Sequence, residues 1–457
     1  MLKLTFKEKV QEAGLKRAVK YLGSNPEENL PKILHFMEKI QRKTSIVGGQ
    51  LAVFKKYIED KDNNWYRLLV SCYHDIDPKV FQTVFTNLVI NASVIGSNRQ
   101  KAAEAKYNCN IPWAILMDPT SACNLHCIGC WAAEYGNKLN MSYETLDSIV
   151  NQGEDLGCFM YIFSGGEPTV RKDDIFRLCT AHPECEFLAF TNATLIDEEF
   201  AKNMLRVKNF IPAISIEGDE EATDFRRGQG TYKRIMKGME ILKKYKLAFG
   251  ASCCYTSRNV QSIGSEAFFD SLIQMGCKFA WFFTYIPVGN AAHTDLMVSA
   301  EQREFMYHQV RSFRKTKPLF TLDFWNDGEY CNGCIAGGRR YLHINANGDI
   351  EPCAFIHYSD SNIKTGTLLQ ALQKPLFMEY RKHQPYNKNN LRPCPLLDNP
   401  GQLVDVVEKS GAASTDLQSP EDVHELCGKC VEHAKSWAPV ADELWGKGHH
   451  VARTSRK

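Results

Sequence analysis

Three cysteines, Cys123, Cys127 and Cys130, lie on one short stretch of the chain with the spacing C-x3-C-x2-C. Three thiolates at this spacing can hold a cluster of four irons and leave one iron without a protein ligand. An iron with an open position can bind a second molecule and do chemistry on it. Zinc is the alternative, but a structural zinc site requires four protein ligands and usually comes from paired C-x2-C motifs. The spacing therefore favours a catalytic [4Fe-4S] cluster.

Two predicted strands position this loop and a second turn. The apolar run 111–117 indicates a buried strand that leads directly into the cysteine loop. Ser142 is suited to cap the helix that follows, and the apolar run 159–163 predicts the next strand. That strand ends at a turn formed by Gly165, Gly166, Glu167 and Pro168. Paired glycines let the backbone approach a ligand closely and the proline stiffens the exit, so the turn is a second candidate binding element.

The cysteine loop and the Gly-Gly-Glu-Pro turn, one strand and one helix apart, resemble the radical S-adenosylmethionine (radical SAM) superfamily. The resemblance implies that SAM binds the open iron through its amino and carboxylate groups. Reduction then cleaves the bond between sulfur and C5′, and the resulting 5′-deoxyadenosyl radical abstracts hydrogen from a substrate. It also implies that the three cysteines hold the catalytic cluster and that the turn from Gly165 to Pro168 holds the methionine amino group. The family commonly has an aromatic residue before the third cysteine, whereas this chain has Gly129 there and Trp131 just after.

Strands and helices are predicted to alternate through the middle of the chain. The expected strands are 111–117, 159–163, 186–190, 210–216, 248–255 and 279–287. This rhythm indicates an α/β fold, and it agrees with the partial parallel (β/α)6 barrel, similar to a TIM barrel, that the resemblance implies. Ligands of such folds bind at the carboxyl ends of the strands, where both motifs lie.

Polar side chains follow several of these strands. The set that the resemblance places near the cofactor is Asn192, Ser215, Glu217, Arg227, Ser252 and Tyr285. It assigns Ser215 and Glu217 to the ribose, Arg227 to the cofactor carboxylate, and Tyr285 to a turn beside the adenine. A guanidinium can pair with a carboxylate through two hydrogen bonds, which suits the role of Arg227. The alternatives are that Ser215 only satisfies a strand end and that Arg227 is a solvated helix charge.

A second group of cysteines follows the predicted barrel. Its members are Cys331, Cys334, Cys353, Cys394, Cys427 and Cys430. An Asn-Gly pair at 347–348 predicts a hairpin that returns Cys353 towards Cys334. The spacing of Cys334, Gly348 and Cys353 resembles the opening of the auxiliary-cluster extension called SPASM or, in a shorter form, twitch.

The resemblance to that extension implies a second iron-sulfur cluster in a small α+β domain. The preferred ligands are Cys331, Cys334 and Cys353 with Cys394 as the fourth, and Cys427 or Cys430 could substitute for it. Six cysteines are too few for two fully ligated clusters. A zinc site built from the two C-x2-C pairs is the alternative, because thiolate spacing alone does not separate the metals.

Composition agrees with a soluble enzyme in a reducing compartment. The formal charge is +2, from 55 basic and 53 acidic residues, so no nucleic-acid surface is expected. Seventeen cysteines favour the cytoplasm, with oxygen kept away from the cluster. The first residues lack the apolar core of a signal peptide, and the apolar stretch 80–95 is too short and too polar to span a bilayer. Contact of the amino-terminal helices with a membrane surface stays open.

We expect four parts in the chain. They are a helical amino-terminal region at 1–108, a radical SAM barrel at 109–317, a SPASM- or twitch-like auxiliary-cluster domain at 318–440 and a basic tail at 441–457. The expected activity is radical abstraction of hydrogen, with peptide or protein modification favoured. Alkylation or C–C bond formation on a lipid, isoprenoid or small metabolite is the alternative, and a metal-binding scaffold with a degenerate barrel is an alternative of another class. An external electron donor such as ferredoxin or flavodoxin is the expected partner.

Overall fold

The computed structural model describes residues 27–29, 32, 57 and 59–448. Its centre is a sheet of nine strands in the order β7-β6-β5-β4-β3-β2-β1-β8-β9. The strands are β1 (Ala114–Met117), β2 (Met160–Phe163), β3 (Glu186–Thr191), β4 (Phe210–Ser215), β5 (Gly250–Tyr255), β6 (Phe279–Thr284), β7 (Phe320–Asp323), β8 (Tyr341–Ile344) and β9 (Ile350–Glu351). Neighbours are parallel except in the β8–β9 hairpin.

The fold is the expected partial TIM-like barrel, and its sheet is not closed. All six predicted strands are confirmed. The sequence did not predict that β7 extends the sheet beyond β6, or that β8 pairs in parallel with β1 on the other side. The predicted Asn-Gly hairpin is confirmed as β8 and β9, with Ile344 opposite Ile350. The region expected to be a separate auxiliary domain therefore contributes strands to the same sheet.

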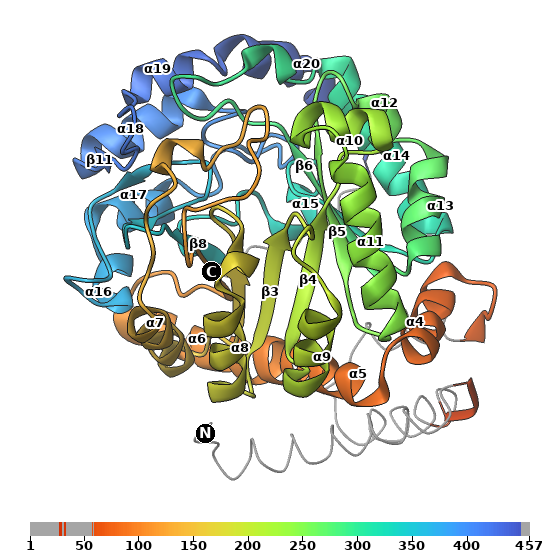
Figure 1. Cartoon of the computed structure of the whole chain (residues 1–457). Helices are drawn as coiled ribbons and strands as arrows, with labels where there is room; N and C mark the ends of the chain where they lie inside the picture. The colour runs from red at the N-terminus through yellow and green to blue at the C-terminus, as the bar shows by residue number, and fades with distance from the viewer. Residues whose placement is uncertain (1–26, 30–31, 33–56, 58, 449–457) are drawn as a thin grey trace.

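Helices cover the outer face of this sheet (Figure 1). The longer ones are α7 (Tyr143–Leu156), α8 (Lys172–Ala181), α9 (Glu198–Val207), α11 (Thr231–Lys244), α13 (Glu266–Met275) and α14 (Ala300–Thr316), and the short ones are η3 (Ala133–Tyr135), η4 (Pro168–Arg171), α10 (Glu220–Arg227), α12 (Val260–Ile263) and η5 (Thr294–Leu296). Ser142 caps α7 as predicted, since its side chain accepts a hydrogen bond from the backbone of Thr145. Leu146, Ile149 and Val150 form the buried face of that helix.

The described amino-terminal elements are α4 (Asn64–Asp75), α5 (Pro78–Phe85), η2 (Thr86–Gly96) and α6 (Ser97–Tyr107). We expected the stretch 80–95 to be too short and too polar to span a bilayer. It belongs to one helix of 30 residues formed by the last three elements, which by length and composition could cross a membrane. In this structure its polar side chains bind barrel loops. The amide of Asn87 donates to the carbonyl of Cys185 at 2.9 Å, and that of Gln100 to the carbonyl of Gly157 at 2.8 Å. These bonds hold the helix against the barrel. The helices expected before residue 57 lie almost wholly outside the described residues.

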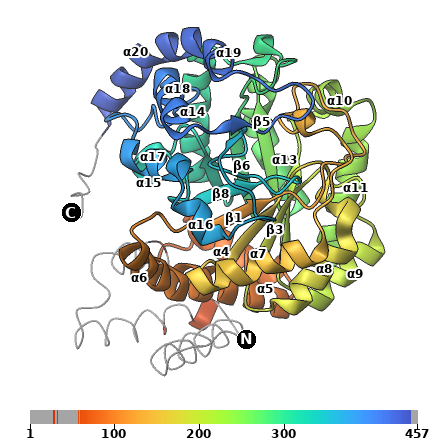
Figure 2. The ribbon, with the colours of Figure 1, turned by 90° about the vertical axis from the view of Figure 1, so that its left-hand side faces the viewer.

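The carboxyl-terminal region lies over one end of the barrel (Figure 2). Its elements are α15 (Gly328–Cys331), β10 (Tyr358–Ser359), α16 (Leu368–Leu372), α17 (Pro375–His383), α18 (Pro400–Ser410), β11 (Ala413–Ser414), α19 (Val423–Gly428) and α20 (Val431–Lys447). Ala441 and Leu444 are buried in α20, so helical structure continues into the stretch expected to be a tail. Residues 449–457 lie outside the description.

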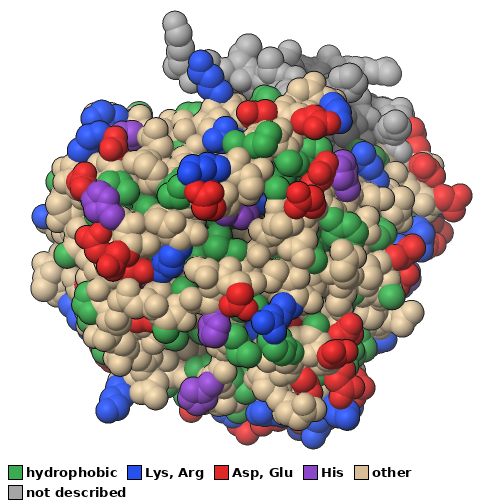
Figure 3. All heavy atoms as spheres, turned by 90° about the horizontal axis from the view of Figure 1, so that it is seen from above, with side chains coloured by type: hydrophobic (Ala, Val, Ile, Leu, Met, Phe, Trp, Pro, Cys, Tyr) green, Lys and Arg blue, Asp and Glu red, His purple; other side chains and the backbone are tan. Residues whose placement is uncertain are grey.

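The face shown in Figure 3 carries acidic and basic side chains interspersed with one another. This agrees with the formal charge of +2. No block of one sign dominates that face.

Candidate active site

The Gly-Gly turn after β2 is fastened to the cysteine loop by its backbone. The amide of Gly166 donates to the carbonyl of Thr120 at 3.0 Å, and the amide of Glu167 donates to the carbonyl of Ala122 at 2.8 Å. A Cβ atom on Gly166 would lie 2.1 Å from the Ala122 carbonyl oxygen, so only glycine allows this approach. The two motifs that the sequence singled out are therefore in direct contact, and the turn fixes the start of the loop that carries Cys123.

The Glu167 carboxylate is buried and hydrogen-bonded within the protein. One oxygen accepts from the backbone and hydroxyl of Thr169 and from the hydroxyl of Thr191 at 2.7 Å, and the other accepts from the amide of Asn192 at 2.7 Å. Burial raises the pKa of this carboxyl group above its ordinary value. The side chain thus joins the end of β2 to the end of β3.

Asn192 binds the cysteine loop directly. Its amide nitrogen donates to the side-chain oxygen of Asn124 at 2.9 Å, and its own oxygen accepts from Thr194. Asn124 lies between Cys123 and Cys127. The predicted strand-end residue therefore acts as a brace for the loop.

Two adjacent arginines meet a buried glutamate beside the loop. One carboxylate oxygen of Glu217 accepts from Arg226 at 2.8 Å and from Arg227 at 2.8 Å. Its other oxygen is buried without a hydrogen-bond partner among the described residues. A guanidinium nitrogen of Arg227 lies 4.0 Å from the sulfur of Cys127, and the carbonyl of Arg226 accepts from the amide of Ile128. Two cations and one anion leave positive charge next to the thiols.

Arg226 is a site residue that the sequence reasoning missed. The run Asp-Phe-Arg-Arg-Gly contains two arginines, and only Arg227 matched the family position. The structure shows that both guanidinium groups bind Glu217, because α10 ends at this point and directs both side chains back towards the loop.

The ring of Tyr285 covers Gly129. A Cβ atom on Gly129 would lie 2.7 Å from that ring, and Gly129 has a φ of +67°, so an aromatic side chain does not fit at this position. The Tyr285 hydroxyl accepts from the backbone of His293 at 3.2 Å, and burial raises its pKa to about 12. The aromatic ring missing from the loop is thus replaced by one from the end of β6.

Ser215 and Ser252 lie opposite one another on β4 and β5. Both are half-buried, as is Cys254 two residues further along β5. The remaining predicted cofactor residues therefore sit on the same region of the sheet as the loop, on neighbouring strands.

The family model of the radical SAM superfamily matches residues 117–256, which include the loop, the turn and the arginine pair. This chain is a radical SAM enzyme. Enzymes of this superfamily use a [4Fe-4S] cluster and SAM. The residues of the site fit both, because three thiols share the loop, a glycine turn lies against it, and a buried oxygen of Glu217 lacks a partner.

Two relatives and one solved structure give the context. The chain is 23% identical over 312 residues to an AdoMet-dependent heme synthase of Nitratidesulfovibrio vulgaris, covering 61% of this chain and 84% of that protein. It is 31% identical over 173 residues to a cysteine-type anaerobic sulfatase-maturating enzyme of Clostridium perfringens, covering 33% and 46%. SuiB of Streptococcus suis bound to S-adenosylmethionine has a similar fold, with a TM-score of 0.56, 19% identity and coverage of 81% and 88%.

The second group of cysteines varies in exposure. Cys427 and Cys430 are buried, Cys334, Cys353 and Cys394 are half-buried as Cys127 and Cys130 are, and Cys331 is exposed. Cys334, Cys353 and Cys394 pack against one hydrophobic core that also contains Cys427 and Cys430. Burial raises the pKa of the Cys334, Cys353 and Cys394 thiols to about 12. The three thiols lie close together. A negative charge on any one of them would therefore raise the pKa of another still further.

A bound metal would compensate the burial of these thiols, because it binds them as thiolates. Within residues 59–448 and the few described before them, no group of three or more His, Cys, Asp or Glu side chains is arranged to hold a single metal ion. Thiolates of an iron-sulfur cluster bind separate irons and need not converge on one point.

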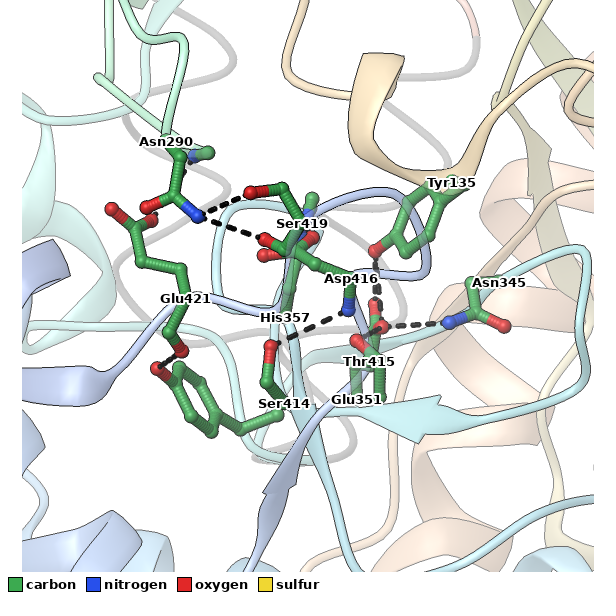
Figure 4. Close-up of polar contacts among 12 residues, drawn as sticks. Tyr135, Asn290, Asn345, Glu351, His357, Ser414, Thr415, Asp416, Ser419 and Glu421 are labelled. Carbon is green, nitrogen blue, oxygen red and sulfur yellow. Dashed lines mark hydrogen bonds and ion pairs between the residues drawn. The ribbon is translucent and has the colours of Figure 1, made fainter.

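A buried polar network lies between the two cysteine regions, and Figure 4 shows the part of it around Glu351. His343 lies between Asp118 at 3.0 Å and Glu351 at 2.6 Å. Burial alone would lower the pKa of His343, but the two carboxylates raise it to about 10, so the imidazole is charged. Asp118 follows β1 directly, and Glu351 precedes Cys353 by two residues.

Glu351 is the centre of this network. It accepts hydrogen bonds from Tyr135 at 2.9 Å, from Asn345 at 2.8 Å and from Thr415 at 2.5 Å. These partners come from the end of the cysteine loop, from the β8–β9 hairpin and from the strand β11 region. The network was missed because its members are far apart in the sequence and belong to no motif.

Proposed function

We propose that Cys123, Cys127 and Cys130 hold the catalytic [4Fe-4S] cluster of this enzyme. When bound and reduced, the cluster and SAM supply a 5′-deoxyadenosyl radical, which abstracts hydrogen from a C–H bond of the substrate. The observation that carries the proposal is the contact between the loop and the Gly-Gly turn, because a structural metal site has no use for a second binding element.

Different groups around the loop are suited to bind different parts of SAM. The side chain of Glu167 is engaged internally, so contact with an amino group falls to the backbone of the turn from Gly165 to Pro168. The unpartnered oxygen of Glu217 is suited to accept from a hydroxyl, as a ribose offers. Arg226 and Arg227 hold that carboxylate and offset the negative charge of the thiolates.

Four further residues border the same region. They are Asn192, Ser215, Ser252 and Tyr285. Asn192 braces the loop, and the Tyr285 ring over Gly129 offers a flat surface on which an adenine can stack.

We further propose that the carboxyl-terminal cysteines hold one auxiliary cluster. The ligand set is Cys331, Cys334, Cys353 and Cys394, with Cys427 or Cys430 as a replacement for the fourth. Packing of Cys334, Cys353 and Cys394 against the core that contains Cys427 and Cys430 supports it. The barrel at 109–317 and the auxiliary region at 318–440 remain the proposed division, with ferredoxin or flavodoxin as electron donor and the cytoplasm as compartment.

Two substrate classes from the sequence remain candidates. Similar proteins support peptide modification. One SuiB structure of similar fold is bound to the precursor peptide SuiA, and one relative is a sulfatase-maturating enzyme. The lining of the barrel favours an apolar substrate instead, as argued below. A tetrapyrrole is a third candidate, because several relatives are named heme synthases.

The test is anaerobic reconstitution of the full chain with iron and sulfide, followed by incubation with SAM and a strong reductant. We expect 5′-deoxyadenosine from the native protein and none from Cys127→Ala. Cys72→Ala, a half-buried thiol on α4, is the control and should retain activity. Formation of 5′-deoxyadenosine by a folded Cys127→Ala protein would contradict the proposal, as would zinc without sulfide in the native one.

A further inference from the structure

The inner face of β6 is lined with aromatic rings. Phe282 stacks on Phe269 of α13, with ring centroids 5.2 Å apart, so it points outward to the helices. Because side chains alternate along a strand, Phe279, Trp281 and Phe283 point to the inner face. All three are half-exposed, whereas Phe282 is fully buried. These rings keep solvent-accessible surface although β6 has a paired strand on each side, so the inner face of β6 is accessible.

These rings belong to a continuous strip of aromatic contacts, here called the aromatic strip. Its members are Phe190, Phe279, Trp281, Phe283, Phe324, Trp325, Phe355 and Trp131. Phe283 stacks on Phe324 at 4.5 Å, and Trp325 contacts Phe355 at 5.4 Å. Phe355 contacts Trp131 at 5.9 Å, and Trp131 follows Cys130 directly. The strip therefore runs from the start of β6 to the cysteine loop.

The strip and the small polar residues occupy different parts of the sheet. In register, Ser252 of β5 lies beside Trp281 of β6, and Trp281 lies beside Leu322 of β7. Gly250 lies beside Phe279, and a Cβ atom there would be 2.5 Å from the Phe279 ring. Small residues on β4 and β5 thus leave room for the rings, with the polar positions on the cofactor side.

The strip offers little to a polar occupant. The inward positions of β6 and β7 carry no charged side chain, and their strand backbones are paired within the sheet. A peptide group that lost its hydrogen bonds to water there would bind unfavourably, and a carboxylate more so. A hydrocarbon chain has no hydrogen bonds to lose, and burial of its apolar surface is favourable. The strip is also elongated, since Phe279 and Phe283 alone are about 13 Å apart along the strand.

We propose that the aromatic strip binds the hydrocarbon chain of a lipid, which presents a C–H bond to the cofactor at the Trp131 end. This inference rests on the proposed function and names its substrate class. An elongated, ring-lined surface whose positions on β6 and β7 are uncharged matches a chain better than a peptide or a disc-shaped tetrapyrrole with carboxylates. His343 lies at the Trp131 end of the strip, with ring centroids 5.6 Å apart.

The first test follows deuterium from substrate into product. The reconstituted full chain is incubated with SAM, reductant and phospholipid vesicles whose acyl chains are deuterated. Parallel arms hold a deuterated isoprenyl lipid, deuterated coproporphyrin III and a deuterated peptide digest. Deuterium in 5′-deoxyadenosine from either lipid arm supports the inference, and the two arms identify the kind of chain. Deuterium only from the porphyrin or peptide arm, or unlabelled 5′-deoxyadenosine in both lipid arms, would overturn it. Absence of any 5′-deoxyadenosine would instead contradict the proposed function.

The second test measures binding and is independent of turnover. A fatty acid carrying a fluorescent group is titrated into the reconstituted full chain, with circular dichroism as a check on folding. We expect Phe324→Ser to weaken binding on the order of tenfold and Phe324→Leu, which stays apolar, to change it little. Phe282→Leu, on the same sheet but facing the helices, is the matched control. Equal affinities of Phe324→Ser and the native protein would overturn the assignment of the strip.

Discussion

The two cysteine regions of this radical SAM enzyme differ in the contacts that surround their thiols. Cys123 is exposed, and its loop is held by backbone contacts and by the arginine pair. Cys334, Cys353 and Cys394 are enclosed by a hydrophobic core with Tyr341, whose hydroxyl lies 2.8 Å from the Cys353 sulfur. Cys331 of the second region is exposed as well. Under the proposed function the first region carries out catalysis, and the second supports the fold or transfers electrons.

The largest expected effect comes from removing ligands of the enclosed region. Cys334→Ala combined with Cys353→Ala should lose the auxiliary cluster, seen as a loss of roughly half of the bound iron and sulfide, because one of two clusters is gone. The variant should still form 5′-deoxyadenosine from SAM, since the open loop is intact. Iron and sulfide analysis alongside product quantification checks both. Loss of SAM cleavage in a folded double variant would contradict the claim that the two regions have separate roles.

Tyr285→Ala should have the next largest effect. It removes the ring that covers Gly129, and we expect the KM for SAM to rise about tenfold with a smaller change in kcat. Tyr285→Phe keeps the ring and loses only the acceptor of the His293 amide, so it serves as the matched control. Equal KM values for Tyr285→Ala and the native enzyme would show that the ring does not contribute to the open site.

Arg227→Gln tests the charge beside the loop. Removing a cation 4.0 Å from the Cys127 sulfur should make reduction of the catalytic cluster harder and lower its midpoint potential by roughly tens of millivolts. The auxiliary cluster should not shift. Redox titration followed by electron paramagnetic resonance measures both, and Arg234→Gln, an exposed arginine on α11, is the control. An equal shift of both clusters would argue against a local effect.

The smallest effect concerns the network between the regions. The pKa of His343 is raised from 6.5 to about 10, so its charged form contributes stability below pH 6.5 that is lost as the pH rises to about 10. His343→Gln should therefore lower the melting temperature at pH 6.5 and flatten its decline towards pH 10. His308→Gln, exposed on α14, should keep the native slope. An unchanged slope in His343→Gln would show that the charged form of His343 does not stabilise the network between the two cysteine regions.

Local patterns predicted much of this fold. Apolar runs located six strands, Ser142 located the start of α7, and Asn-Gly located the β8–β9 hairpin. The sequence also predicted that the loop and the glycine turn lie at the same end of the barrel. It did not show that β8 pairs with β1, because pairing between strands more than 200 residues apart leaves no local signal. It also did not show that the Glu167 carboxylate accepts hydrogen bonds from Thr191 and Asn192 at the end of the neighbouring strand.

The central claim is that the Cys123 loop leaves one iron open to SAM and that the enclosed region does not. The most direct measurement is electron paramagnetic resonance of the reduced Cys334→Ala, Cys353→Ala protein, which keeps only the loop cluster, before and after addition of SAM. The account predicts that SAM changes the g values of this cluster, and that the cluster left in a loop variant, Cys127→Ala, gives a spectrum that SAM does not alter. An unchanged spectrum of the loop cluster, or a SAM-dependent change in the auxiliary one, would contradict it.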